Sequence, residues 1–140
     1  MTPTTVTALI FIAAGLLIMA LSVPMMRRRI APNPLYGLRV RATFADEWVW
    51  YEANARSGRD LLLVGVGICI LAVVLPMIPG VTERSYPGIL SVIVLVAVVV
   101  TAVIDIRYAN RLLAERLASG VELKPRNPLR RGPIKSMRGP

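Results

Sequence analysis

Histidine is absent from this sequence of 140 residues, and cysteine occurs once, as Cys69. With no imidazole and a single thiol, the chain lacks the usual ligand set for a structural zinc ion and cannot form an intramolecular disulfide. Cys69 lies midway along an apolar stretch, where a thiol is most simply a small packing residue. We therefore expect no metal site, no cofactor and no catalytic residues, and we expect the protein not to be an enzyme.

Charged residues are also missing from three long stretches, although they make up 18% of the sequence. The stretches without Lys, Arg, Asp or Glu are residues 1–26, 61–82 and 85–104. The chain is 55% hydrophobic, and about 20 apolar residues in a helix cross the hydrocarbon core of a bilayer. The sequence thus predicts an all-α membrane protein with a membrane domain over residues 1–119. The three predicted transmembrane helices are residues 6–26, 61–78 and 87–106.

The basic residues predict how these helices are oriented. Of the 17 Lys and Arg residues, seven lie between the first two predicted spans, one between the second and third, and nine after the third. Loops rich in Lys and Arg stay in the cytoplasm, so we expect the N-terminus outside and both the loop 27–60 and the C-terminus inside. Arg27, Arg28 and Arg29 follow the first apolar stretch instead of preceding it, which favours a retained helix over a cleavable signal peptide.

The third helix is expected to continue beyond the membrane to about residue 119, because its apolar stripe persists until Gly120. Asp105 would lie at the inner boundary. We expect it to be a solvated carboxylate near Arg107 or another inner-face cation, with a proton relay as the alternative. Residues 120–140 contain four prolines and several basic residues, which predict a disordered cytoplasmic tail attracted to anionic headgroups. Nucleic acid is not an expected partner, because no recognisable module accompanies the charge.

The loop 27–60 contains most of the residues from which a function could be inferred. Thr43 is a plausible N-cap and Gly58 a plausible end for a short helix over about residues 44–57. One face of this helix would carry three aromatic residues, Phe44, Trp48 and Tyr51, together with Ala55. Such a face next to a membrane is typical of an amphipathic helix lying at the interface, and contact with a ligand is the alternative.

The same loop resembles the signature of the SdpI family of bacterial membrane proteins. The resemblance lies in Asn33-Pro-Leu-Tyr36-Gly37-Leu-Arg39, then Thr43, Glu47-Trp48, Asn54 and Gly58. Members of that family include an immunity protein that protects a sporulating bacterium from its own killing peptide and sequesters a repressor at the membrane. The resemblance implies a multi-pass protein of the bacterial inner membrane that binds a ligand or partner through these residues: Asn33, Tyr36, Gly37, Arg39, Thr43, Glu47, Trp48, Asn54 and Gly58.

Two functions are compatible with these features. The first is immunity to, or sensing of, a membrane-active peptide toxin by binding. The alternative is an accessory structural subunit of a larger membrane complex, in which Gly65 and Gly67 would permit close approach of helices. A transporter is disfavoured, because the spans contain almost no ionisable residue.

Overall fold

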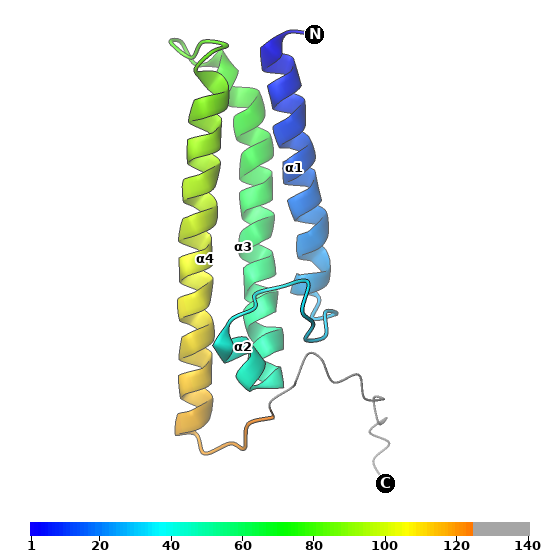
Figure 1. The fold of residues 1–140 in the computed structure, drawn as a ribbon, viewed down its shortest axis with the longest axis vertical. Coiled ribbons are helices and arrows are strands. Elements are labelled where there is room, and N and C mark those ends of the chain that lie inside the picture. Colours follow the sequence, from blue (N-terminus) through cyan, green and yellow to red (C-terminus); the bar gives the residue numbers. More distant parts are fainter. Residues whose placement is uncertain (125–140) are drawn as a thin grey trace.

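The computed structural model describes residues 1–124, which form an all-helical bundle (Figure 1). Its elements are α1 (Pro3–Met26), α2 (Arg41–Ala45), α3 (Glu47–Val74), the 3₁₀ turn η1 (Leu75–Met77) and α4 (Tyr86–Ala118). Three stretches are long and apolar enough to cross a membrane: Pro3–Met26, Glu47–Met77 and Tyr86–Ala118. The prediction of an all-α protein with three membrane-spanning helices is confirmed. Most of the predicted tail, residues 120–140, lies outside the described residues.

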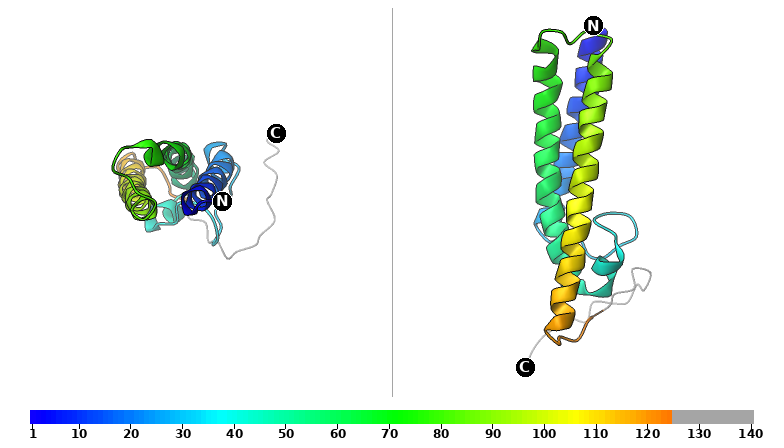
Figure 2. Two further views of the ribbon diagram at one scale, coloured as in Figure 1. Left: turned by 90° about the horizontal axis from the view of Figure 1, so that it is seen from above. Right: turned by 90° about the vertical axis from the view of Figure 1, so that its left-hand side faces the viewer.

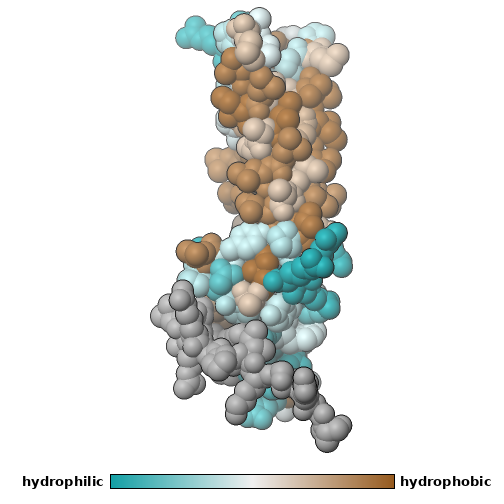
Figure 3. Space-filling model, turned by 90° about the vertical axis from the view of Figure 1, so that its right-hand side faces the viewer, coloured by the Kyte–Doolittle hydropathy of each residue, from teal (hydrophilic) through white to brown (hydrophobic). Residues whose placement is uncertain are grey.

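Helix α3 is the centre of the bundle, and α1 and α4 both pack chiefly against it (Figures 1 and 2). The loop between α1 and α3, which includes α2, lies at the end of the bundle opposite the N-terminus. We call this the α2 end. Figure 3 shows hydrophobic residues over most of one face of the bundle and hydrophilic residues gathered towards the α2 end. The long hydrophobic part fits a bilayer, and the α2 end fits an aqueous or headgroup environment.

Small residues bring α1 and α3 into close contact. A side-chain carbon on Gly58 would lie 2.9 Å from the Ser22 carbonyl oxygen, and one on Gly65 would lie 2.8 Å from the Gly15 carbonyl oxygen. These two contacts are seven residues apart on each helix, so the small residues form a stripe on facing surfaces. Gly65 therefore does permit close helix approach. At Gly67 no described atom lies within 4 Å of a side-chain carbon built there, so this glycine takes no part in helix contacts within the described chain.

The predicted interfacial helix over residues 44–57 does not exist as a separate element. Residues 47–57 are the first turns of α3, which passes through Gly58 without interruption. The N-cap of α3 is Asp46, whose Oδ1 accepts hydrogen bonds from the backbone nitrogens of Trp48 and Val49. Gly58 serves the contact with α1 and does not end a helix. A glycine needed for close packing and a glycine that ends a helix look the same in sequence.

Candidate functional site

A rigid turn begins the loop that follows α1. The Oδ1 atom of Asn33 accepts hydrogen bonds from the backbone nitrogens of Leu35, at 2.9 Å, and Tyr36, at 2.7 Å. Its Nδ2 atom donates to the carbonyl oxygens of Ala31 and Tyr36. One side chain thus satisfies four backbone groups, which fixes the position from which Tyr36 enters the bundle. Asn33 acts within the loop, as a positioning residue.

The next part of the loop is attached to α3. Gly37 has a φ angle of +102°, and a side chain there would collide with the Oδ1 atom of Asn54. That oxygen accepts a hydrogen bond of 2.6 Å from the Leu38 backbone nitrogen, and the Asn54 amide nitrogen donates to the Trp50 carbonyl at 2.9 Å. Glycine is required here both by the backbone conformation and by the close contact. The two predicted site residues Gly37 and Asn54 therefore touch each other.

Thr43 and Trp50 complete this attachment. The Thr43 hydroxyl accepts a hydrogen bond from the Val40 nitrogen, and it lies 2.9 Å from the Leu38 carbonyl oxygen. The Trp50 Nε1 atom donates to the Ile30 carbonyl at 2.8 Å, and its side chain is fully buried. The sequence prediction omitted Trp50. Its spacing of four residues from Asn54, which places both on one face of a helix, is the signal that would have found it.

Arg39, another predicted site residue, donates a hydrogen bond to the Pro34 carbonyl oxygen within the same loop. The carboxylate of Glu52 pairs with a different cation. Glu52 lies 2.5 Å from Arg28, immediately after α1. The guanidinium of Arg39 is thus used to close its own loop.

The start of α3 holds the segment after α4. The backbone nitrogen of Lys124 donates to Asp46 Oδ2 at 3.1 Å, and the Glu47 nitrogen donates to the Lys124 carbonyl at 3.2 Å. Arg116 lies 3.5 Å from Asp46 Oδ1, and its guanidinium stacks over the Trp48 ring at 5.1 Å. Burial raises the pKa of Asp46, but the hydrogen bonds from the backbone of Lys124 and Val49, with the charge of Arg116, outweigh it and hold that pKa below its ordinary value.

A cavity of about 310 Å³ lies between α1, α3 and α4, and the loop closes it at the α2 end. We call it the inner cavity. Its apolar lining includes Ile18, Leu21 and Val98, and its polar lining includes Tyr36, Ser57 and Asp105. Two buried atoms in this lining have no hydrogen-bond partner among the described residues: the Tyr36 hydroxyl and Asp105 Oδ1. Burial also raises the pKa of the Tyr36 phenol, so this group is neutral at physiological pH.

Asp105 differs from the expectation. Its exposed fraction is 2%, and its neighbours are the Ser57 hydroxyl, the Asp60 carboxyl and the Arg56 guanidinium. The prediction that this carboxylate is solvated is therefore wrong. The cation whose charge acts on it is Arg56, another cation than Arg107, as the expectation allowed. The carboxylate is buried because it packs against Ser57 and Asp60 of α3.

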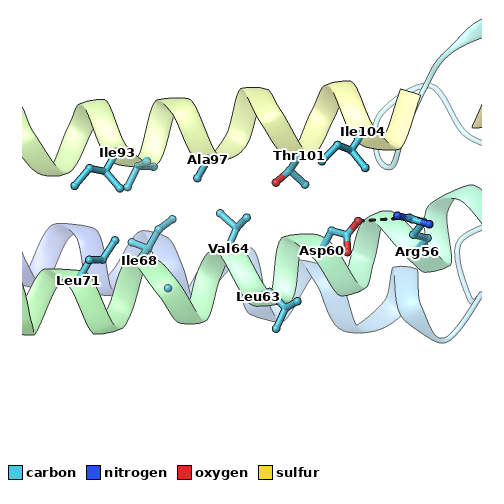
Figure 4. Close-up of a pocket in the computed structure, with 12 residues that line it drawn as sticks. Arg56, Asp60, Leu63, Val64, Ile68, Leu71, Ile93, Ala97, Thr101 and Ile104 are labelled. Atoms are coloured by element: carbon cyan, nitrogen blue, oxygen red, sulfur yellow. Dashed lines mark ion pairs between the residues drawn. The ribbon is translucent and has the colours of Figure 1, made fainter. Parts of the chain in front are cut away.

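A second hollow, which we call the outer groove, lies between α3 and α4 and has a volume of about 490 Å³. Figure 4 shows Ile93, Ala97 and Ile104 of α4 facing α3 across it, with Arg56 and Asp60 at one end. The Arg56 Nε atom lies 3.7 Å from Asp60 Oδ2. Thr101 lines both the outer groove and the inner cavity, so only the α3–α4 contact separates the two.

The nine predicted site residues therefore fall into three groups. The loop and its attachment to α3 bring together six of them: Asn33, Tyr36, Gly37, Arg39, Thr43 and Asn54. Glu47 and Trp48 lie at the start of α3, beside the segment after α4. Gly58 lies in the α1–α3 contact. Among the nine, Tyr36 is the residue that lines the inner cavity and also has a buried polar atom without a described partner.

The comparison with known families identifies the family of the chain. The model of the SdpI/YfhL protein family matches residues 29–106, more than half of the chain. The chain belongs to the SdpI/YfhL family. The matched segment contains all nine predicted site residues of this SdpI/YfhL protein, together with Asp105. No curated protein and no solved structure matches the chain.

Proposed function

We propose that this SdpI/YfhL-family membrane protein binds a membrane-active peptide and thereby protects the cell from it or senses it. The observation that supports this most directly is the inner cavity, which is closed by the loop carrying the family signature and contains two unpartnered polar groups. A hollow of this kind within a membrane-spanning bundle is suited to a ligand that arrives through the bilayer. The mechanism is binding, with no chemical step.

The signature residues would have different roles in such a site. Asn33, Thr43 and Asn54 use their polar atoms on the backbone of the loop, so they are positioning residues. Tyr36 and Asp105 line the cavity and each has a buried polar atom without a described partner, so they are the ligand-contacting candidates. The function thus depends on the signature mainly through the shape that it gives to the cavity wall.

We further propose that the protein lies in the bacterial cytoplasmic membrane with its N-terminus outside and the α2 end inside. The distribution of basic residues supports this orientation, because Arg84 is the single basic residue between the second and third apolar helices. Anionic headgroups would then face the Arg residues that follow α1. The test uses the exposed residues Glu83 and Glu122 in a Cys69→Ser background. A membrane-impermeant maleimide added to intact cells should label Glu83→Cys and leave Glu122→Cys unlabelled until the membrane is opened.

The peptide hypothesis is tested by survival. A sensitive bacterial host is challenged with a panel of membrane-active peptides, with and without the gene, at matched protein abundance in the membrane. We expect the gene to raise survival against at least one peptide, and we expect Asp105→Asn to abolish that gain. Glu115→Gln is the matched control, since Glu115 lies on the same helix but is exposed. Identical survival with and without the gene across the panel would remove the proposed function.

The alternative is an accessory subunit of a larger membrane complex, and the outer groove favours it. Gly67 leaves that groove open, and its lining is mostly apolar, which suits a helix of a partner protein. Purification in mild detergent followed by mass spectrometry tests this alternative. A stoichiometric partner that is lost in Ala97→Trp would support it, whereas a chain that purifies alone or only with copies of itself would count against it.

A further inference from the structure

The buried carboxylate of Asp105 forms no ion pair with a described residue, although the charge of Arg56 acts on it from a greater distance. Asp60, the neighbouring carboxylate, has Arg56 at 3.7 Å. Arg56 also lies over the Tyr108 ring, with its guanidinium carbon 4.4 Å from the ring centre, so it is shared between Asp60 and Tyr108. None of the ion pairs formed by the described part of the chain includes Asp105. The Oδ1 atom of Asp105 is buried and has no hydrogen bond there, and the polar neighbours of the carboxyl group are the side chains of Ser57 and Asp60.

An unpaired carboxylate is unstable in such surroundings. Removing a charge from water is costly unless a counter-charge or hydrogen bonds replace the water, and ionisable groups inside membrane proteins are therefore usually functional. In this bundle the Asp60 carboxyl beside Asp105 adds repulsion. A ligand with a positive charge would relieve both effects at once.

The rest of the inner cavity indicates which kind of chemical group on the ligand would carry the positive charge. Tyr36 lines the same cavity, and its hydroxyl has no described partner, so a small movement of this side chain would offer an oxygen to an N–H donor. The remaining wall is mostly aliphatic, with Ile18 and Leu21 from α1 facing Val98 from α4. A volume of about 310 Å³ suits a side chain or a short alkyl segment and is too small for a folded partner.

We infer that the inner cavity is a binding site for an organic cation, an ammonium or guanidinium group on an apolar stem, with Asp105 as its counter-charge and the Tyr36 hydroxyl as a second acceptor. This inference rests on the proposed function, since it names the part of a membrane-active peptide that the protein recognises. A bare metal ion fits less well. No group of three potential metal ligands occurs in residues 1–124, and hard cations take six or more oxygens.

The experiment uses the full-length protein in nanodiscs of zwitterionic phosphatidylcholine, which removes non-specific attraction of cations to anionic lipid. Two photo-crosslinking probes are compared, a dodecyl primary ammonium and a dodecyl alcohol, each with a diazirine on the chain. Mass spectrometry locates the crosslinks. We expect the ammonium probe to label the cavity-lining segments of α1 and α4 about tenfold more than the alcohol does, the effect of one charge-assisted hydrogen bond.

Three variants make the result decisive. Asp105→Asn should reduce ammonium labelling to the level of the alcohol, and Glu115→Gln should leave it unchanged. Val98→Trp fills the cavity while keeping the carboxylate, so it should also remove the labelling, and it provides the answer if Asp105→Asn does not fold. Equal labelling by the two probes, retained labelling in the cavity-filling variant, or displacement of the ammonium by sodium would overturn the inference.

The outcome is separable from that of the survival assay, because the crosslinking contains no peptide and no cells. Labelling that depends on Asp105 supports the cation site even where no peptide alters survival. Survival that depends on the gene, together with probes that label equally, keeps the proposed function and removes this site.

Discussion

The Asn54 side-chain oxygen accepts a hydrogen bond of 2.6 Å from the backbone nitrogen of Leu38, sixteen residues earlier in the chain. The other end of the same amide donates to the Trp50 carbonyl, and only 2% of Asn54 is exposed. One side chain of α3 therefore holds the loop that closes the inner cavity. This hydrogen bond attaches the loop part of the family signature to α3.

Replacing Asn54 by alanine should release this loop. The Leu38 nitrogen would lose its acceptor, and an unsatisfied buried donor costs about 1–3 kcal/mol. We expect Asn54→Ala to lower the free energy of unfolding in detergent by this amount and to accelerate hydrogen exchange of the Leu38 amide. The control is Asn110→Ala, since Asn110 is exposed on α4. Equal stability of the two variants would contradict the assigned role of Asn54.

Gly37→Ala should damage the same attachment by a collision. Gly37 and Gly80 both have positive φ angles, of +102° and +92°, so alanine is strained at either position. Only at Gly37 would the new carbon meet another side chain, the Asn54 oxygen, whereas Gly80 has no described atom within 4 Å. Gly80→Ala therefore measures the backbone strain alone. We expect Gly37→Ala to be less stable than Gly80→Ala by about 1–3 kcal/mol in chemical unfolding, and equal losses would show that the contact is unimportant.

The membrane-spanning helices could be predicted from the sequence because the signal is local. A stretch without charge, such as residues 85–104, must lie in an apolar environment whatever its neighbours are. The helix boundary near Gly58 could not be predicted in this way. Whether Gly58 ends a helix or lets a second helix pack closely against it depends on Ser22 and Met25 of α1, which are distant in sequence.

The candidate site was predictable only in part, for the same physical reason. The family signature identified Asn54 and Gly37, but the contact between them follows from the path of the loop. Asp105 was expected at a solvated boundary because the sequence places it near the end of an apolar run. Its burial results from packing against Ser57 and Asp60 of α3, beside the cavity that Tyr36 of the loop also lines. Long-range packing therefore decided which polar groups are available to a ligand.

The small-residue stripe between α1 and α3 predicts a difference between two glycines of one helix. A side-chain carbon on Gly65 would lie 2.7 Å from Met19 Cγ and 2.8 Å from the Gly15 oxygen, whereas Gly67 is open. Forcing the helices apart should cost about 1–3 kcal/mol in Gly65→Ala, and Gly67→Ala should stay within about 0.5 kcal/mol of the wild type. Unfolding in mixed detergent micelles measures both. A larger loss for Gly67→Ala than for Gly65→Ala would refute the helix register.

The ion pair between Asp46 and Arg116 predicts a dependence on pH. The pKa of Asp46 is lowered in the folded protein, so its carboxylate stabilises the fold fully above the ordinary aspartate pKa of about 3.9, and this contribution is lost as the pH falls through the lower folded value. The segment at Lys124, whose backbone nitrogen is bound to Asp46, should be released over the same range. Protection factors for the amide of Lys124, from hydrogen exchange at several pH values, measure this release.

Asp46→Asn separates the charge from the helix cap, because asparagine is as good an N-cap as aspartate. This variant should keep α3 intact, lose about 1 kcal/mol of stability at neutral pH through the missing charge at the helix N-terminus, and lose the acid-dependent step in protection. Glu115→Gln is the control, since its carboxylate lies 4.0 Å from Arg111 in an exposed pair and should leave that step in place. An acid-dependent release that persists in Asp46→Asn would mean that another carboxylate holds the segment after α4.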